Sequence, residues 1–303
     1  MKYLETRKIN RINDYFFKSL MGNEKRSALT LRFLNLILNR TGNDEFKTVQ
    51  FLNSENDPLT QDKKLSILDI KASVDDISFV DIEVQVARQN YMAKRSMYYL
   101  SRMYSEQMVK NQNYDELKPV IGINLLDFNL FKPKEIPAWH NFANFTLHGT
   151  SKIISDSISL HFLELPKLKY SDIKKVKRLE AWGAYFSGCS ESELEVLSMN
   201  EPLLKDALSY EHAFANNNGE YIKYRQREDA IREETTKMLM AEKRGIKQGI
   251  RQGIRQGMEQ GRLNAAKQIV INGLNKGYDL HIISDITGLS ISDIEKIQKE
   301  YNK

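Results

Sequence analysis

The chain has 303 residues, of which 41% are hydrophobic and 28% charged, a balance typical of a protein that folds around a core. Its single cysteine excludes an intrachain disulfide framework, and the lack of any apolar run of about 18 residues excludes a membrane-spanning helix. The first residues lack the apolar core of a secretion signal, so we expect a cytoplasmic protein without a membrane partner. The formal charge is +5, and residues 223–262 carry all of this excess, with 11 basic and six acidic side chains.

Hydrophobic periodicity predicts alternating helices and strands up to about residue 220. A short helix is expected to follow the N-cap residue Asn13 and to end at Gly22, with a longer amphipathic helix after it. Strands are predicted over residues 48–52, 65–72, 79–86, 120–126 and 159–165. Further helices are predicted over residues 88–110, 171–187 and 190–215. This mixture indicates an α/β or α+β domain over residues 1–222.

The composition changes after this domain. Residues 223–262 are predicted to form a charged helix or linker, in which glycine recurs every fourth position from Gly245 to Gly261. Each glycine costs a helix about 1 kcal/mol relative to alanine, so a helix here needs a partner. Three interpretations stay open: helix packing in a homodimer, phosphate binding by Lys247, Arg251 and Arg255, and a disordered tether. Residues 263–303 are predicted to form a small helical module that resembles a helix-turn-helix, and its nearly neutral face favours protein contact over DNA reading.

The most informative segment is a predicted hairpin with its turn at residues 74–78. Period-two alternation places Asp69 and Lys71 on one face of the first strand. It likewise places Asp81, Glu83 and Gln85 on one face of the second. If paired positions sum to 152, Asp69 faces Glu83 and Lys71 faces Asp81. Opposed carboxylates about 5 Å apart repel unless a cation lies between them, and Mg²⁺ or Mn²⁺ suits such a site. The alternative is a solvated polar face on an edge hairpin.

Several segments resemble, in the same order, the recombination-promoting nuclease and transposase family of the PD-(D/E)XK nuclease superfamily. The matching segments are residues 13–18, 68–72, 82–85, 95–100 and the glycine-punctuated basic tail. The resemblance implies a restriction-endonuclease-like α/β fold, a mixed sheet flanked by helices, with a C-terminal helical extension.

The resemblance also assigns roles to single residues. Asp69 and Glu83 would be the two metal-binding carboxylates, and Asp14 would contact the metal through water, although it equally suits a helix N-terminus. Gln85 stands where the superfamily usually has a catalytic lysine, and a neutral amide can only hydrogen-bond. Lys71 is a candidate replacement, with a salt bridge to Asp81 as the alternative role.

On the helix after the hairpin, Arg88, Arg95, Tyr99 and Arg102 form one stripe. Arginines beside an active face hold DNA phosphates, whereas the alternative is an ordinary solvated face. The resemblance favours Arg95 and Tyr99 as site residues.

These features together predict a Mg²⁺- or Mn²⁺-dependent DNA endonuclease, linked to recombination or mobile elements, with DNA as its partner and a homodimer as its assembly. No P-loop or Gly-x-Gly-x-x-Gly motif is present, so no nucleotide cofactor is expected. The rival hypothesis is a non-catalytic DNA-binding or assembly protein that keeps the nuclease fold.

Overall fold

The computed structural model describes residues 7–52, 70–87, 91–109 and 113–301. Its contacts divide the chain into two compact units, Met1–Ile231 and Arg232–Lys303. The composition change predicts a boundary after residue 222, whereas the contacts place it after Ile231 because Tyr224 is buried in the first unit. Within the described part of the chain, no helix has the length and apolar character needed to cross a membrane.

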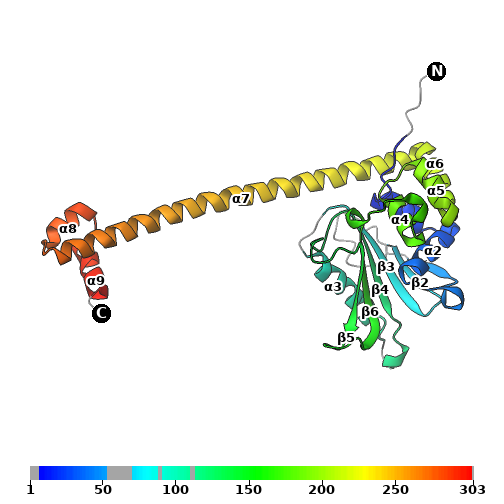
Figure 1. Cartoon of the computed structure of the whole chain (residues 1–303), viewed down its shortest axis with the longest axis horizontal. Coiled ribbons are helices and arrows are strands. Elements are labelled where there is room, and N and C mark those ends of the chain that lie inside the picture. The colour runs from blue at the N-terminus through cyan, green and yellow to red at the C-terminus, as the bar shows by residue number, and fades with distance from the viewer. Residues whose placement is uncertain (1–6, 53–69, 88–90, 110–112, 302–303) are drawn as a thin grey trace, which may run out of the picture. The chain divides into compact units, whose positions relative to one another are not determined.

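The first unit is built on a six-stranded mixed sheet, with the strand order β1-β2-β3-β4-β6-β5 (Figure 1). The strands are β1 Val49–Leu52, β2 Ile70–Val74, β3 Ser78–Gln85, β4 Val120–Leu126, β5 His140–Thr146 and β6 Ile153–Glu164. Strands β3, β4 and β6 run parallel, while β1, β2 and β5 pair antiparallel with their neighbours. The predicted α/β class is therefore confirmed: helices flank a mixed sheet of the restriction-endonuclease-like kind.

The β2–β3 hairpin has the predicted register, because Lys71 pairs with Asp81 and Ile70 with Ile82. Its turn places Asp75 at φ 48° and Asp76 at φ 55°, a left-handed conformation that aspartate tolerates better than most residues. The Asp75 carboxylate also accepts hydrogen bonds from the backbone N–H groups of Lys47 and Thr48. These bonds tie the turn to the segment before β1 and fix the register on which the site depends.

One face of the sheet packs into the main core of the unit. The helices of this core are α1 Asp14–Met21, α2 Ser27–Ile37, α4 Arg178–Phe186, α5 Glu191–Asn200 and α6 Leu203–Asn216. The Asn13 side chain caps α1 as predicted, by accepting bonds from Tyr15 and Phe16. The predicted helix over residues 190–215 is in fact two helices, because the chain turns at Glu201-Pro202.

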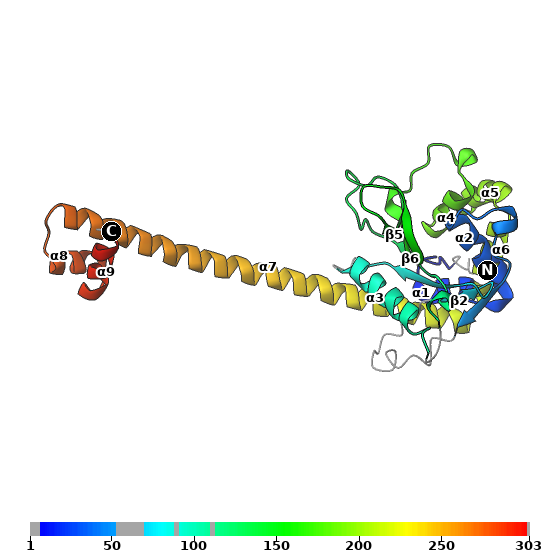
Figure 2. The same ribbon diagram turned by 90° about the horizontal axis from the view of Figure 1, so that it is seen from below.

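Helix α3, Met92–Ser105, covers the other face of the sheet and is the crossover between the parallel strands β3 and β4 (Figures 1 and 2). Its Leu100 lies so close to Gly122 of β4 that a β-carbon there would be 2.6 Å from the leucine Cδ1. Glycine at this position lets the helix approach the strands closely. The residues beside Gly122 on the same face are those of the site.

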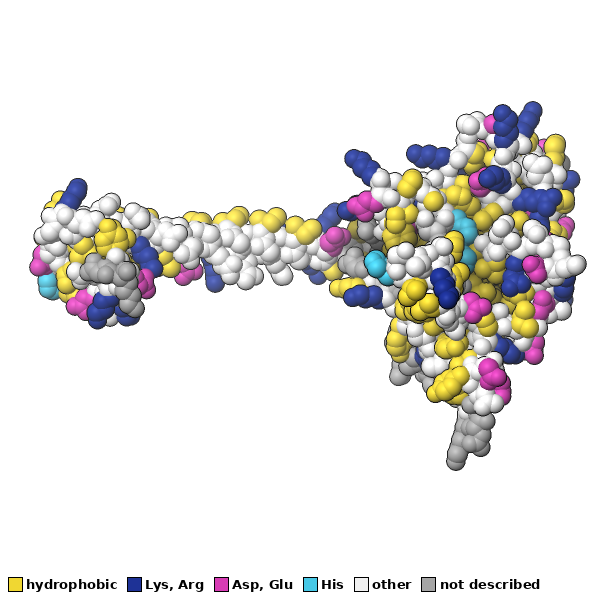
Figure 3. All heavy atoms as spheres, turned by 60° about the horizontal axis from the view of Figure 1, so that its bottom comes forward, with side chains coloured by type: hydrophobic (Ala, Val, Ile, Leu, Met, Phe, Trp, Pro, Cys, Tyr) yellow, Lys and Arg dark blue, Asp and Glu magenta, His cyan; other side chains and the backbone are white. Residues whose placement is uncertain are grey.

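Helix α7, Asn218–Asn275, is continuous through the glycine repeat, so the repeat is helical rather than a break in the chain. A β-carbon at any of the five repeat glycines would meet nothing within 4 Å apart from the adjacent residues and the nearby backbone of the helix itself. Exposed hydrophobic side chains recur along this helix, among them Ile246, Ile250, Ile254 and Met258 (Figure 3).

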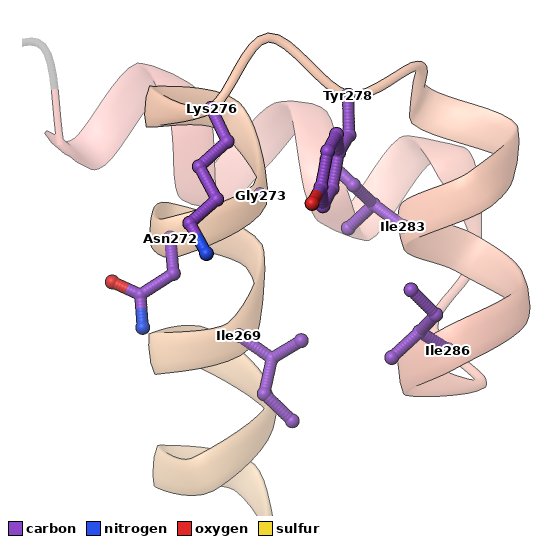
Figure 4. Close-up of a pocket in the computed structure, with 7 residues that line it drawn as sticks. All are labelled: Ile269, Asn272, Gly273, Lys276, Tyr278, Ile283 and Ile286. Carbon is purple, nitrogen blue, oxygen red and sulfur yellow. The ribbon is translucent and has the colours of Figure 1, made fainter.

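The second unit ends in a small helical module with its own core. Helices α8 Leu280–Thr287 and α9 Ile291–Tyr301 pack with the end of α7 around Val270, Ile283 and Ile294. Ser290 caps α9 by accepting a bond from the Asp293 N–H. An open groove of about 220 Å³ lies between α7 and α8, where Lys276 and Tyr278 flank isoleucine side chains (Figure 4).

Candidate functional site

Strand β3 carries three polar side chains on the face that α3 covers. Asp81, Glu83 and Gln85 alternate with Val80 and Ile82, which are buried in the main core. The alternation therefore places Asp81 and Glu83 on the face under α3, while the apolar side chains of the opposite face pack in the core. Both acids lie inside the protein, since Asp81 is 8% and Glu83 only 5% exposed.

The Glu83 carboxylate is held by two side chains. Its Oε1 lies 2.7 Å from Arg95 Nη2 and accepts a hydrogen bond of 2.6 Å from the Gln85 amide. Burial raises the pKa of Glu83, while the charge of Arg95 and the Gln85 bond act in the opposite direction. Gln85, which stands where the superfamily usually has a lysine, thus contacts the Glu83 carboxylate directly.

Asp81 is the less compensated of the two acids. Its Oδ1 is buried and has no hydrogen-bond partner within the described residues. Burial, followed by the negative charge of Glu83, raises the pKa of Asp81 to about 7, although Lys71 and Arg95 oppose this. A buried carboxylate oxygen without a donor is rare in proteins, and a bound ion is one way to satisfy it.

Helix α3 supplies the cationic side of the site. Arg95 reaches Glu83, and its guanidinium lies 5.6 Å from the centre of the Tyr99 ring. Arg102 instead pairs with Glu106 on its own helix. The predicted arginine stripe thus divides: Arg95 and Tyr99 lie at the site together, whereas Arg88 is outside the described residues.

Asp14 is engaged by another partner. The Arg227 Nε of α7 donates to both Asp14 oxygens, at 2.8 and 2.7 Å, and a second guanidinium nitrogen contacts the same carboxylate. Helix α1 packs against β3, so Asp14 belongs to the layer beside the site strand. Its contact with a metal stays a prediction.

The remaining predicted residues divide into three groups. Asp69 precedes β2 and lies outside the described residues. Lys71 is opposite Asp81 in the hairpin. Lys247, Arg251 and Arg255 are exposed on α7 in the second unit.

The sequence does not single out a buried hydrogen-bonded pair next to Glu83. Ser96 of α3 donates to the Asn124 side chain at 2.9 Å, and Asn124 is the neighbour of Glu83 across the β3–β4 ladder. One sequence signal for it exists, because Asn124 is the one side chain with hydrogen-bonding groups in a strand that is buried throughout, Val120–Leu126.

No group of three or more histidine, cysteine, aspartate or glutamate side chains placed to hold a metal occurs in the described ranges. The donors of the site nevertheless fit a hard divalent cation, since carboxylate oxygens are its preferred ligands and one Asp81 oxygen lacks a donor. Glu83 stays the predicted ligand for such an ion, with Asp69 as its expected partner.

A family model described as PD-(D/E)XK nuclease family transposase matches residues 11–241. The chain belongs to this family. The match includes the whole sheet, α3 and the start of α7, so the PD-(D/E)XK comparison applies to the region that holds the site. No curated protein and no solved structure shows significant similarity to the chain.

Proposed function

We propose that this member of the PD-(D/E)XK family is a metal-dependent DNA endonuclease that hydrolyses phosphodiester bonds, linked to recombination or mobile elements. The observation that supports the proposal best is the buried Glu83, held by Gln85 and Arg95 on β3, within the region that matches the family. A carboxylate and a guanidinium on one small surface suit a metal ion and a phosphate respectively.

Each side chain has a distinct task in this proposal. Asp69 and Glu83 would hold Mg²⁺ or Mn²⁺, with Asp14 as a predicted contact through water, and the ion would supply Lewis-acid activation of the phosphate and of water. Gln85 orients the Glu83 carboxylate through its 2.6 Å bond. Lys71 supplies positive charge beside the acids in place of the usual lysine.

DNA contacts come from two regions in the proposal. Arg95 and Tyr99 hold the backbone next to the site, with Arg88 and Arg102 further along the stripe. Lys247, Arg251 and Arg255 on α7 add contacts outside it, supported by their exposure.

The exposed hydrophobic side chains of α7 support a homodimer, because a lone helix with five glycines is marginal in water.

The direct test is plasmid cleavage by the purified full chain with Mg²⁺ or Mn²⁺, comparing Asp69→Ala and Glu83→Ala with the control Asp115→Ala, an exposed acid. We expect both site variants to lose at least about 100-fold in rate, as typical for a group that acts on the transition state, and the control to keep full activity. Full activity in both site variants would contradict the assignment.

A second test concerns the three α7 cations. Replacing them by glutamine should reduce the slope of log K for DNA binding against log salt concentration by up to about 0.9 per lost phosphate contact. An unchanged slope would remove α7 from the DNA-binding surface.

Gln85 is the reason to keep a second candidate. A neutral amide does not stabilise developing negative charge as an ammonium does, so the protein could instead bind DNA without cleaving it. This alternative predicts DNA retention with no cleavage in any divalent ion.

A further inference from the structure

We propose that Ser96 and Asn124 are positioning residues, which keep Arg95 beside the site when a cation takes the Glu83 carboxylate. The inference rests on the proposed function, because it concerns how the same carboxylate and guanidinium share their tasks. It adds two residues that neither touch the expected metal nor belong to the catalytic motif.

Two bridges join the same pair of elements side by side. Arg95 and Ser96 are neighbours on α3, and Glu83 and Asn124 are neighbours across the β3–β4 ladder. The first bridge is the Arg95–Glu83 ion pair at 2.7 Å, and the second is the Ser96 Oγ–Asn124 Oδ1 hydrogen bond at 2.9 Å. The geometry therefore fixes the backbone of Arg95 through the residue that follows it.

The two bridges differ in burial. The Arg95 side chain is 25% exposed, whereas Ser96 is 5% and Asn124 only 2% exposed. Asn124 also donates from Nδ2 to the His161 carbonyl of β6 at 3.3 Å, so both ends of its amide have a partner. A buried, paired amide is costly to break, because each separated group would lose its partner away from water. The neutral bridge is thus the fixed one and the ionic bridge is the exchangeable one.

The difference matters because Glu83 Oε1 serves Arg95 and Gln85 at once. A divalent cation competes with the guanidinium for this carboxylate. When the cation wins, the ion pair no longer holds α3 to β3, but the Ser96–Asn124 bridge still holds α3 to β4. The guanidinium, released from Glu83, then stays within side-chain reach of the site and pairs with a DNA phosphate in place of that carboxylate.

This arrangement predicts opposite effects of one mild substitution on two ligands. In Ser96→Ala, Arg95 is held less firmly on Glu83, so Mn²⁺ should bind about threefold more tightly. Duplex DNA in Ca²⁺ should bind about threefold more weakly, in keeping with about 0.6 kcal/mol from a loosened hydrogen bond. A merely structural loss would weaken both ligands together. Asn124→Leu should give the same pattern, and Ser101→Ala, at an exposed position of α3, should change neither affinity.

The experiment uses the full chain, with calorimetry for Mn²⁺ alone, fluorescence anisotropy for a short DNA duplex in Ca²⁺, and a circular dichroism melt for each variant. The decisive step repeats Ser96→Ala in an Arg95→Gln background, where it should have no further effect on either affinity, because Ser96 acts through Arg95. Additive effects, or weaker binding of both ligands by folded Ser96→Ala, would overturn the inference and leave the proposed function standing. A wild-type chain that binds no Mn²⁺ would overturn both.

Discussion

Two buried glutamates lie on the same face of the sheet but in different surroundings. Glu164, at the end of β6, is fully buried and accepts bonds from the N–H groups of Leu130 and Phe131. It also forms an ion pair of 2.7 Å with Lys167, which is itself bonded to the Ile136 carbonyl. The partners described for Glu83 are the side chains of Arg95 and Gln85, and both are partly exposed.

The contrast shows that a buried glutamate on this sheet can be held in two different ways. Backbone donors cannot leave Glu164 without a rearrangement of the loop they belong to, so this carboxylate keeps its partners. Side-chain partners can leave Glu83 by rotation, so its carboxylate can change ligands. Burial alone does not distinguish these two acids, whereas the backbone donors of Glu164 do.

The largest effect should come from breaking the structural pair. Glu164→Gln leaves the buried Lys167 ammonium without its counter-charge, and we expect a loss of about 3–5 kcal/mol in the free energy of unfolding. Urea denaturation measures it. The matched control is Glu135→Gln, because Lys132–Glu135 is an exposed pair with the same spacing and should change stability by less than about 1 kcal/mol.

Glu83→Gln completes that comparison. It should cost much less stability than Glu164→Gln, since burial already disfavours the charged form of Glu83 and Arg95 can turn to water. Equal losses in the two variants would show that Glu83 is as fixed as Glu164.

Acid should weaken the β5–β6 end of the sheet. Burial, and then the neighbouring His140, lower the pKa of His161 to about 4. The two rings lie beside each other, with His140 Nε2 3.1 Å from His161 Nδ1. Because the unfolded imidazole binds its proton near pH 6.5, stability is full above that pH and falls by about 3 kcal/mol as the pH drops to 4. Urea denaturation at pH 6.5 or above and at pH 4 should show this loss in the free energy of unfolding for the wild type and for His148→Gln, a control at an exposed histidine. The loss should be absent in His161→Phe. An equal acid loss in His161→Phe would assign the titration to other groups.

The sequence predicts the elements whose patterns are strong. Strand β4 is predicted residue for residue, and the hairpin register follows from the alternation around Asp76. Strand β5 is missed because its side chains are mostly half-buried or exposed, so no period-two pattern marks it. The same limit applies to pairs that form across elements.

Such pairs define much of the site. The Asp14–Arg227 and Ser96–Asn124 contacts join residues far apart in the chain, so no local sequence pattern predicts them. Asp81 appears in the sequence only as another acid of the hairpin. Its burial and its unpaired oxygen come from α3 packing over Gly122, which is a property of the tertiary structure.

The smallest predicted effect concerns Gln85, and it tests whether a positive charge next to Glu83 would speed up cleavage. In Gln85→Lys the side chain keeps a donor toward Glu83 and adds a positive charge that a neutral amide lacks. We expect cleavage to rise by about tenfold, about 1.4 kcal/mol of transition-state stabilisation, with little change in DNA affinity. Single-turnover plasmid nicking measures the rate, and Gln85→Met, which removes the donor at similar size, should lower it. A slower Gln85→Lys beside a fully active Gln85→Met would show that the amide is not a substitute for lysine, and that the positive charge of the reaction comes from Lys71 or Arg95 instead.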